Sequence, residues 1–189
     1  MGIKISFAEI QDKIIKIISR HLDSNDRNHT LGVVKEVKRL IKEEKITKKE
    51  SEILVLAAYL HDYTKRDGSI KKHHLTGSKF SAEILKQLSY PYFQEVSTVI
   101  ITHSCLIRKF YDPEIFNQKP TTKLQLLLIK ADMLEQVKLK GLIRIFLNNW
   151  KKGLDYIEHF RDIKQSYFES KQILKETSQK LIVITANKR

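Results

Sequence analysis

The 189-residue chain carries 35 lysine and arginine residues against 22 aspartate and glutamate residues, a formal charge of +13, with 41% hydrophobic residues. This composition is typical of a globular protein rather than a disordered one, and the charge favours anionic partners, either small phosphorylated molecules or nucleic acid. A single cysteine, Cys105, excludes an internal disulfide and a multi-cysteine zinc site. The chain shows no secretory signal and no membrane-length apolar run, so we expect a cytoplasmic protein with no membrane partner.

Helical signals begin at the N-terminus. Ser6 and Glu9 have the spacing of a capping box, and apolar residues follow at helical intervals. A polar break at residues 23–26 comes next, and the second helix is predicted to begin near Asn28 or His29. The first third of the chain therefore predicts two amphipathic helices.

A second capping box, Thr47 to Glu50, opens a helix that is predicted to end around Asp62–Thr64, before a polar loop at Lys65–Lys72. Residues 181–185 have strand-like composition but are interpreted as a terminal tail. The remaining helical patterns are separated by a less regular stretch at 107–119 and lie at residues 80–88, 93–103, 124–135, 139–150 and 154–174. These patterns predict an all-α, single-domain helical bundle over residues 1–189, with C-terminal helices at 141–180.

Several charged or titratable residues fall on the apolar faces of these helices. Asp132 lies four residues after Leu128 and shares its apolar face. Asp62 follows His61 at a helix C-terminus, where the helix dipole disfavours a carboxylate unless a cation is near. Taken singly, each residue is also compatible with a structural salt bridge or a hydrogen-bonded core histidine. Together they favour a metal site of the kind that helical bundles build from facing side chains.

The order of these residues along the chain resembles the motif order of a known protein superfamily. His29, the pair His61–Asp62 and Asp132 follow the order H…HD…D, within the segments 28–34, 56–65 and 129–135. The sequence resembles the HD-domain phosphohydrolase superfamily over about residues 25–140. Two intermediate segments, 73–78 and 100–104, are also similar to segments of that superfamily. The resemblance implies an all-helical core and metal-dependent hydrolysis of a phosphoester or phosphoanhydride.

By this resemblance, a first divalent metal ion (Mn, Fe, Co, Ni, Zn or Mg) would be bound by His29, His61, Asp62 and Asp132. His73 and His103 would bind a second ion or contact the phosphate, and His74 could replace His73 in that role. The implied catalytic residues are Asp62, His73 and His103, with Asp62 orienting or deprotonating a water molecule.

Three further residues are candidates for supporting roles. Arg27 and Lys65 are possible phosphate clamps, with plain surface charge as the alternative. Glu135 either orients a ligating histidine or is merely an i,i+3 neighbour of Asp132.

The substrate is open at this stage. The sequence is similar to HD-domain hydrolases of diadenosine polyphosphates around residues 61–65, and to small nucleotide pyrophosphohydrolases at Gly141–Phe146. It departs from the latter at Lys130, where those proteins carry an acidic residue. We expect a small phosphorylated substrate of nucleotide type. The alternatives are a nucleotide-binding regulatory module without turnover and a basic nucleic-acid-binding helical protein, and the oligomeric state is open.

Overall fold

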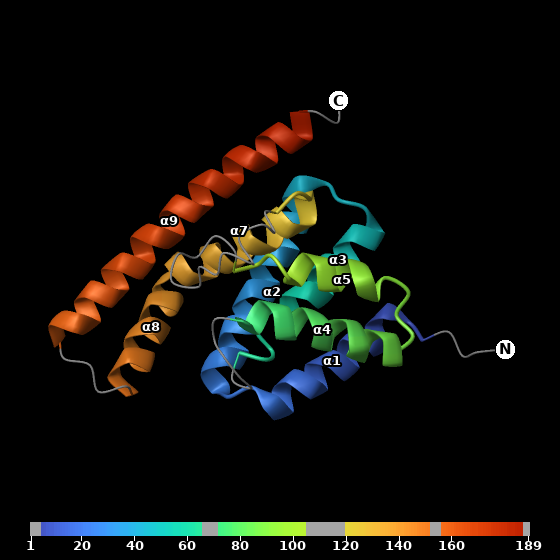
Figure 1. Ribbon diagram of the computed structural model, residues 1–189, viewed down its shortest axis with the longest axis horizontal. Helices are drawn as coiled ribbons and strands as arrows, with labels where there is room; N and C mark the ends of the chain where they lie inside the picture. The colour runs from blue at the N-terminus through green and yellow to red at the C-terminus, as the bar shows by residue number, and fades with distance from the viewer. Residues whose placement is uncertain (1–4, 66–71, 105–119, 152–155, 187–189) are drawn as a thin grey trace.

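Every regular element of the described chain is a helix, which confirms the all-α prediction (Figure 1). The computed structural model describes residues 5–65, 72–104, 120–151 and 156–186. Within these ranges the helices are α1 (Phe7–His21), α2 (Ser24–Glu44), α3 (Lys48–Leu60), α4 (His73–Gln87), α5 (Phe93–Ile100), α7 (Lys123–Val137), α8 (Leu139–Lys151) and α9 (Tyr156–Ala186).

Capping side chains fix where several helices begin. Both predicted capping boxes are present: Ser6 with Glu9 starts α1, and Thr47 with Glu50 starts α3. In each box the side chain of the cap accepts from a backbone N–H of the first turn, and the glutamate accepts from the backbone of the cap. A third box, formed by Thr122, starts α7.

Predicted boundaries are wrong at α2, at α9 and at α4, which begins at His73 rather than near residue 80. Helix α2 begins at Ser24 rather than near His29, because the Asp23 carboxylate caps it by accepting from the backbone N–H groups of the next turn. Helix α9 continues to Ala186, so the segment predicted as a tail is helical. Leu181 is 4% exposed and packs with the main core, so tertiary contacts outweigh the strand-like composition there.

Helix α3 is the centre of the bundle. All eight residues 53–60 are buried, so this helix is apolar on every side and is surrounded by other helices. It contacts α1, α2, α4, α5 and α7. The C-terminal end of α3 therefore opens into the interior, where its last residues face side chains from several neighbours.

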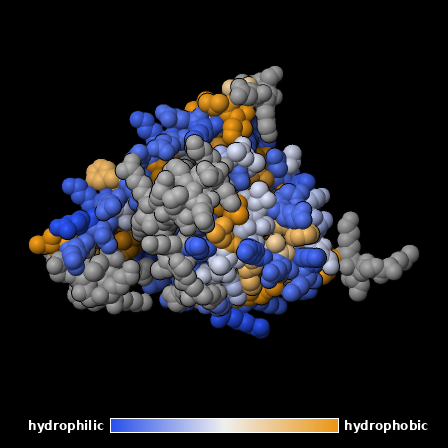
Figure 2. Space-filling view, in the orientation of Figure 1, coloured by the Kyte–Doolittle hydropathy of each residue, from blue (hydrophilic) through white to orange (hydrophobic). Residues whose placement is uncertain are grey.

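Helices α7, α8 and α9 form the other side of the molecule. Helix α9 runs along α7, and α8 packs against both (Figure 1). Figure 2 shows a largely hydrophilic surface on the face in view, with hydrophobic residues in separate patches. No helix in the described ranges has both the length and the apolar content that a membrane span requires.

Candidate metal centre

Six buried side chains from five parts of the fold meet at the C-terminal end of α3. They are His29 from α2, His61 and Asp62 at the end of α3, His73 at the start of α4, His103 just after α5, and Asp132 from α7. None is more than 6% exposed. A cluster of imidazoles and carboxylates at this depth needs mutual hydrogen bonds or cations to offset the loss of hydration.

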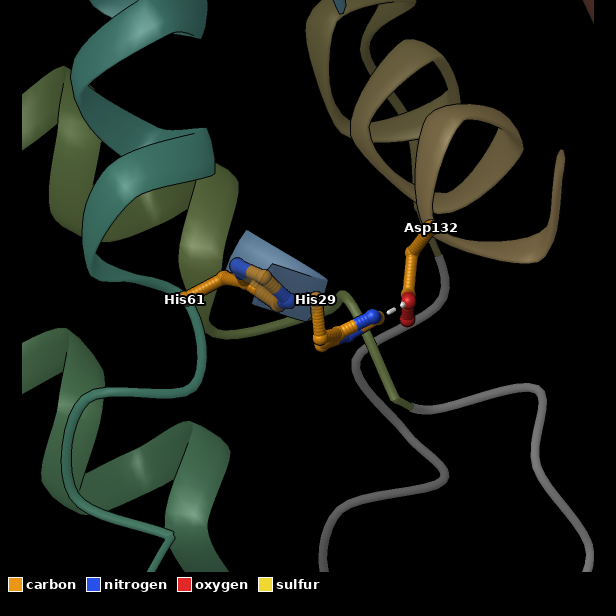
Figure 3. Close-up of side chains that lie close together, drawn as sticks. All are labelled: His29, His61 and Asp132. Atoms are coloured by element: carbon orange, nitrogen blue, oxygen red, sulfur yellow. Dashed lines mark ion pairs between the residues drawn. The ribbon is translucent and has the colours of Figure 1, made fainter. Parts of the chain in front are cut away.

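Three of these residues form a first group, drawn in Figure 3: His29, His61 and Asp132. Each offers a ligand atom, and the three atoms lie within 4.8 Å of one another. His29 Nε2 is 3.2 Å from Asp132 Oδ1, and this contact joins α2 to α7. The donors come from three different helices, so their convergence depends on the packing of the bundle.

Asp62, His73 and His103 form a second group of the same kind. Asp62 Oδ1 is 3.3 Å from His73 Nε2 and 3.4 Å from His103 Nε2. The two imidazole nitrogens are 3.0 Å apart, so one ring donates a hydrogen bond to the other.

Asp62 connects the two groups. Its Oδ1 faces the second group, whereas its Oδ2 lies 3.5 Å from His29 Nε2 in the first. Lys65 Nζ, from the turn after α3, donates to the same Oδ2 at 2.6 Å. One carboxylate thus presents its two oxygens to two neighbouring sets of donors.

Backbone carbonyls orient two of the rings. His61 Nδ1 is 2.9 Å from the carbonyl oxygen of Ala58, and His103 Nδ1 is 2.7 Å from that of Ile100. A carbonyl can only accept, so Nδ1 carries the proton in both rings and Nε2 of a neutral ring keeps its lone pair. His61 Nε2 is buried without a hydrogen-bond partner among the described residues. A lone pair left in this way suits a ligand atom for a cation.

The pKa values of the residues in the first group also favour a cation site. Burial lowers the pKa of His61 to about 4, so this ring is neutral at physiological pH. Burial also opposes ionisation of Asp132, but its hydrogen bond with His29 outweighs burial and holds the pKa well below the usual range. A neutral imidazole beside an ionised carboxylate is a donor set that binds divalent metals.

Asp62 and His29 have pKa values that are shifted in opposite directions, and both shifts favour the charged form. For Asp62, Lys65 and His61 outweigh burial, so its pKa is well below the usual value. For His29, burial and the charge of Arg144 oppose protonation, but hydrogen bonds with Asp132 and Glu135 prevail and raise its pKa. The carboxylates that attract this proton would equally attract a metal cation.

Glu135 directly contacts His29, one of the six clustered residues. We call this cluster the cage: His29, His61, Asp62, His73, His103 and Asp132. Its Oε2 accepts from His29 Nδ1 at 2.5 Å, which leaves His29 Nε2 facing Asp132 and Asp62. Of the two roles considered for Glu135, the structure shows the contact that orients a histidine. The same oxygen accepts from Arg144 Nη2 at 3.0 Å. Arg144 comes from α8 and is absent from the sequence-based candidates, because nothing in the local pattern relates it to His29.

The structure brings most, but not all, of the predicted residues together. Of the two adjacent histidines, His73 contacts Asp62, whereas His74 is buried with its ring 5.7 Å from the His73 ring and 6.4 Å from the His103 ring. Arg27 lies half-buried on α2, two positions before His29, and residues two apart point in nearly opposite directions from a helix. Its role as a phosphate clamp stays a prediction. The predicted loops at 65–72 and 107–119 lie mostly or wholly outside the described residues.

Comparison with protein-family models gives one match, the HD domain, over residues 26–136. The match covers more than half of the chain and includes all six residues of the cage. The chain belongs to the HD-domain family. Members of this family are generally metal-dependent hydrolases, and the two groups of donors in this HD domain fit a metal site. The comparisons with curated proteins and with solved structures returned no match.

Proposed function

We propose that this HD-domain protein hydrolyses a phosphoester or phosphoanhydride bond of a nucleotide-like substrate and depends on one or two divalent metal ions. The observation that supports the proposal most strongly is the position of Asp62, whose Oδ1 lies near His73 and His103 and whose Oδ2 lies near His29 of the first donor group. A structural salt bridge would not require a second set of histidines on the other oxygen. Many phosphate-cleaving enzymes use two neighbouring metal ions, and two adjacent donor groups fit that arrangement.

The proposed ligands of the first ion are His29, His61, Asp62 and Asp132. When bound, such an ion supplies positive charge that stabilises the phosphate and lowers the pKa of water toward neutrality. Asp62 is the carboxylate that would orient water and accept its proton, because it is ionised and central.

His73 and His103 have one of two roles in this proposal. In a site with two ions, their Nε2 atoms and Asp62 bind the second one. In a site with a single ion, one of these rings donates from Nε2 to a phosphate oxygen and stabilises charge that develops during cleavage. Lys65 Nζ, which donates to Asp62 Oδ2 at 2.6 Å, would contact the same phosphate.

A metal-supplemented substrate screen tests the proposal. The purified protein is analysed for bound metals, and then incubated with Mn²⁺, Co²⁺, Ni²⁺, Zn²⁺ or Mg²⁺ and with nucleotides, dinucleoside polyphosphates or phosphomonoesters. We expect phosphate or pyrophosphate release that requires a metal and stops on chelation. Absence of both bound metal and metal-stimulated release contradicts the proposal. Metal and nucleotide binding without turnover would instead identify a regulatory module.

A further inference from the structure

Helix α8 places an arginine beside the cage although it lies beyond the segment that matches the family model. The match ends at residue 136, and Arg144 lies in the second turn of α8. Gly141 allows this close return of the chain, because a Cβ there would lie 2.5 Å from the carbonyl oxygens of Glu135 and Gln136 at the end of α7. The sharp α7–α8 connection therefore directs Arg144 back toward α7.

Arg144 is held near the cage through a short chain of contacts. Its Nη2 donates to Glu135 Oε2 at 3.0 Å, and that oxygen is 2.5 Å from His29 Nδ1. The side chain of Arg144 is 14% exposed, so its charge is poorly hydrated.

The guanidinium keeps an unused donor. Its Nε is buried and has no hydrogen-bond partner in the described part of the chain. A buried charged donor without a partner is costly, and the usual partner for the fork of Nε and Nη is a pair of carboxylate or phosphate oxygens. Glu135 does not fill this role, because it accepts from Nη2 and not from Nε. An oxyanion of the substrate would satisfy the remaining donor.

We propose that Arg144 binds a phosphate group adjacent to the one that is cleaved, so that this site selects substrates with two or more linked phosphates over phosphomonoesters. The inference rests on the proposed function. Arg144 from α8 and Lys65 from the turn after α3 reach the cage from different elements, and a bound metal ion would add further positive charge. Cations that arrive from separate directions suit an anion whose charge is spread along a chain of phosphates.

A purely structural arginine is the competing explanation. In that case Arg144 only fixes Glu135, and its loss would act through His29 on the metal alone. A binding measurement that requires no turnover distinguishes the two explanations. Inorganic pyrophosphate and inorganic phosphate are titrated calorimetrically into the 189-residue protein loaded with Mn²⁺, and Mn²⁺ itself is titrated into the metal-free protein.

The variants are Arg144→Gln, which removes the charge, and Arg144→Lys, which keeps the charge but lacks the fork. Lys138→Gln is the matched control, because Lys138 pairs with Glu36 outside the cage. We expect Arg144→Gln to weaken pyrophosphate binding about tenfold or more, the scale of a lost charge-assisted hydrogen bond, and phosphate binding much less. Arg144→Lys should show a smaller loss, and Lys138→Gln should bind pyrophosphate as the unmodified protein does.

Two results overturn the inference. One is unchanged discrimination between pyrophosphate and phosphate in both Arg144 variants. The other is a loss of Mn²⁺ affinity large enough to explain all of the weakened pyrophosphate binding. Arg144 would then act only by supporting Glu135. If Arg144→Gln does not fold, as judged by circular dichroism, the Arg144→Lys titration decides alone. Failure of the unmodified protein to bind Mn²⁺ or to hydrolyse any phosphate compound would instead count against the proposed function.

Discussion

The two donor groups of the cage are built on different kinds of backbone. In the first group, two of the three residues, His29 and Asp132, lie inside the helices α2 and α7, whereas His61 follows the end of α3, and His29 is held in place by Glu135. In the second, His73 is the first residue of α4, and His103 lies in the turn after α5. Side chains inside packed helices are positioned more rigidly than those at helix ends, which fray more readily.

This difference predicts unequal metal affinity. A preorganised set of donors loses less conformational entropy on binding, so the first group should hold its ion more tightly than the second. Asp62 belongs to the second group through Oδ1 and contacts His29 of the first through Oδ2. The following variants test whether the two halves differ as the structure indicates, beginning with the residue that they share.

Replacement of Asp62 should have the largest effect. Asp62→Ala removes the carboxylate that both groups contact, and hydrolysis should fall by about three orders of magnitude or more, the scale of losing a metal together with a proton acceptor. Phosphate release under saturating Mn²⁺ measures the loss, and circular dichroism should show unchanged helical content. Asp12→Ala, an exposed position on α1, is the control. Substantial turnover in Asp62→Ala rules out the proposed centre.

A pair of histidine variants separates the halves. His61→Ala should abolish the tightly bound ion, whereas His73→Ala should retain it and lose only the weaker ion or the phosphate contact. Metal content after extensive dialysis, together with calorimetric titration of Mn²⁺, distinguishes these results. Equal loss of metal in both variants would mean that the two groups bind metal as a single site. The predicted difference in their metal affinity would then be wrong.

Most of the cage was predictable because its residues carry local signals. Asp132 in an apolar run and a carboxylate at the end of α3 are anomalies that a sequence displays directly. The choice between His73 and His74 was not predictable, because both are buried and adjacent, and only the start of α4 determines which ring contacts Asp62. The role of Asp23 as an N-cap was readable from its residue type but was interpreted as a break in the helix.

Arg144 and the end of α9 were missed for a different reason. The contact between Arg144 and Glu135 spans nine residues and a change of helix direction, so no helical periodicity relates the two. The segment after Leu181 has a composition that favours strands, and its helical state depends on packing against the core. In both cases the deciding interaction is tertiary, and a local pattern does not contain it.

Glu135→Gln should have an intermediate effect. The carboxylate is ionised, because its hydrogen bond with His29 lowers its pKa against the opposing effect of burial. A neutral amide weakens the bond to His29 Nδ1, and loss of such a supporting contact typically reduces metal affinity about 10–100-fold. Glu36→Gln is the control, since Glu36 is a buried glutamate that pairs with Arg39 and Lys138 away from the cage. If both variants bind Mn²⁺ with the same affinity, the more rigid support proposed for the first group is absent.

The smallest effect is expected at Gly32, which lies one turn after His29 on α2. A Cβ at this position would lie 2.7 Å from Glu135 Cγ, so Gly32→Ala must displace the Glu135 side chain. Alanine is favoured over glycine in a helix by about 1 kcal/mol, which offsets part of the strain. We therefore expect little change in melting temperature but Mn²⁺ binding a few-fold weaker, measured by differential scanning and titration calorimetry.

A double variant that combines Gly32→Ala with Glu135→Gln shows whether Gly32 affects metal binding through Glu135. If the methyl group weakens metal binding only by moving that carboxylate away from His29, then Gly32→Ala should cost less affinity in the Glu135→Gln background than alone. Full additivity would mean that the methyl group disturbs α2 itself, since residues that share a contact are expected to couple. A coupled result would show that the spacing of α2 and α7 at this glycine helps to set the strength of the first donor group.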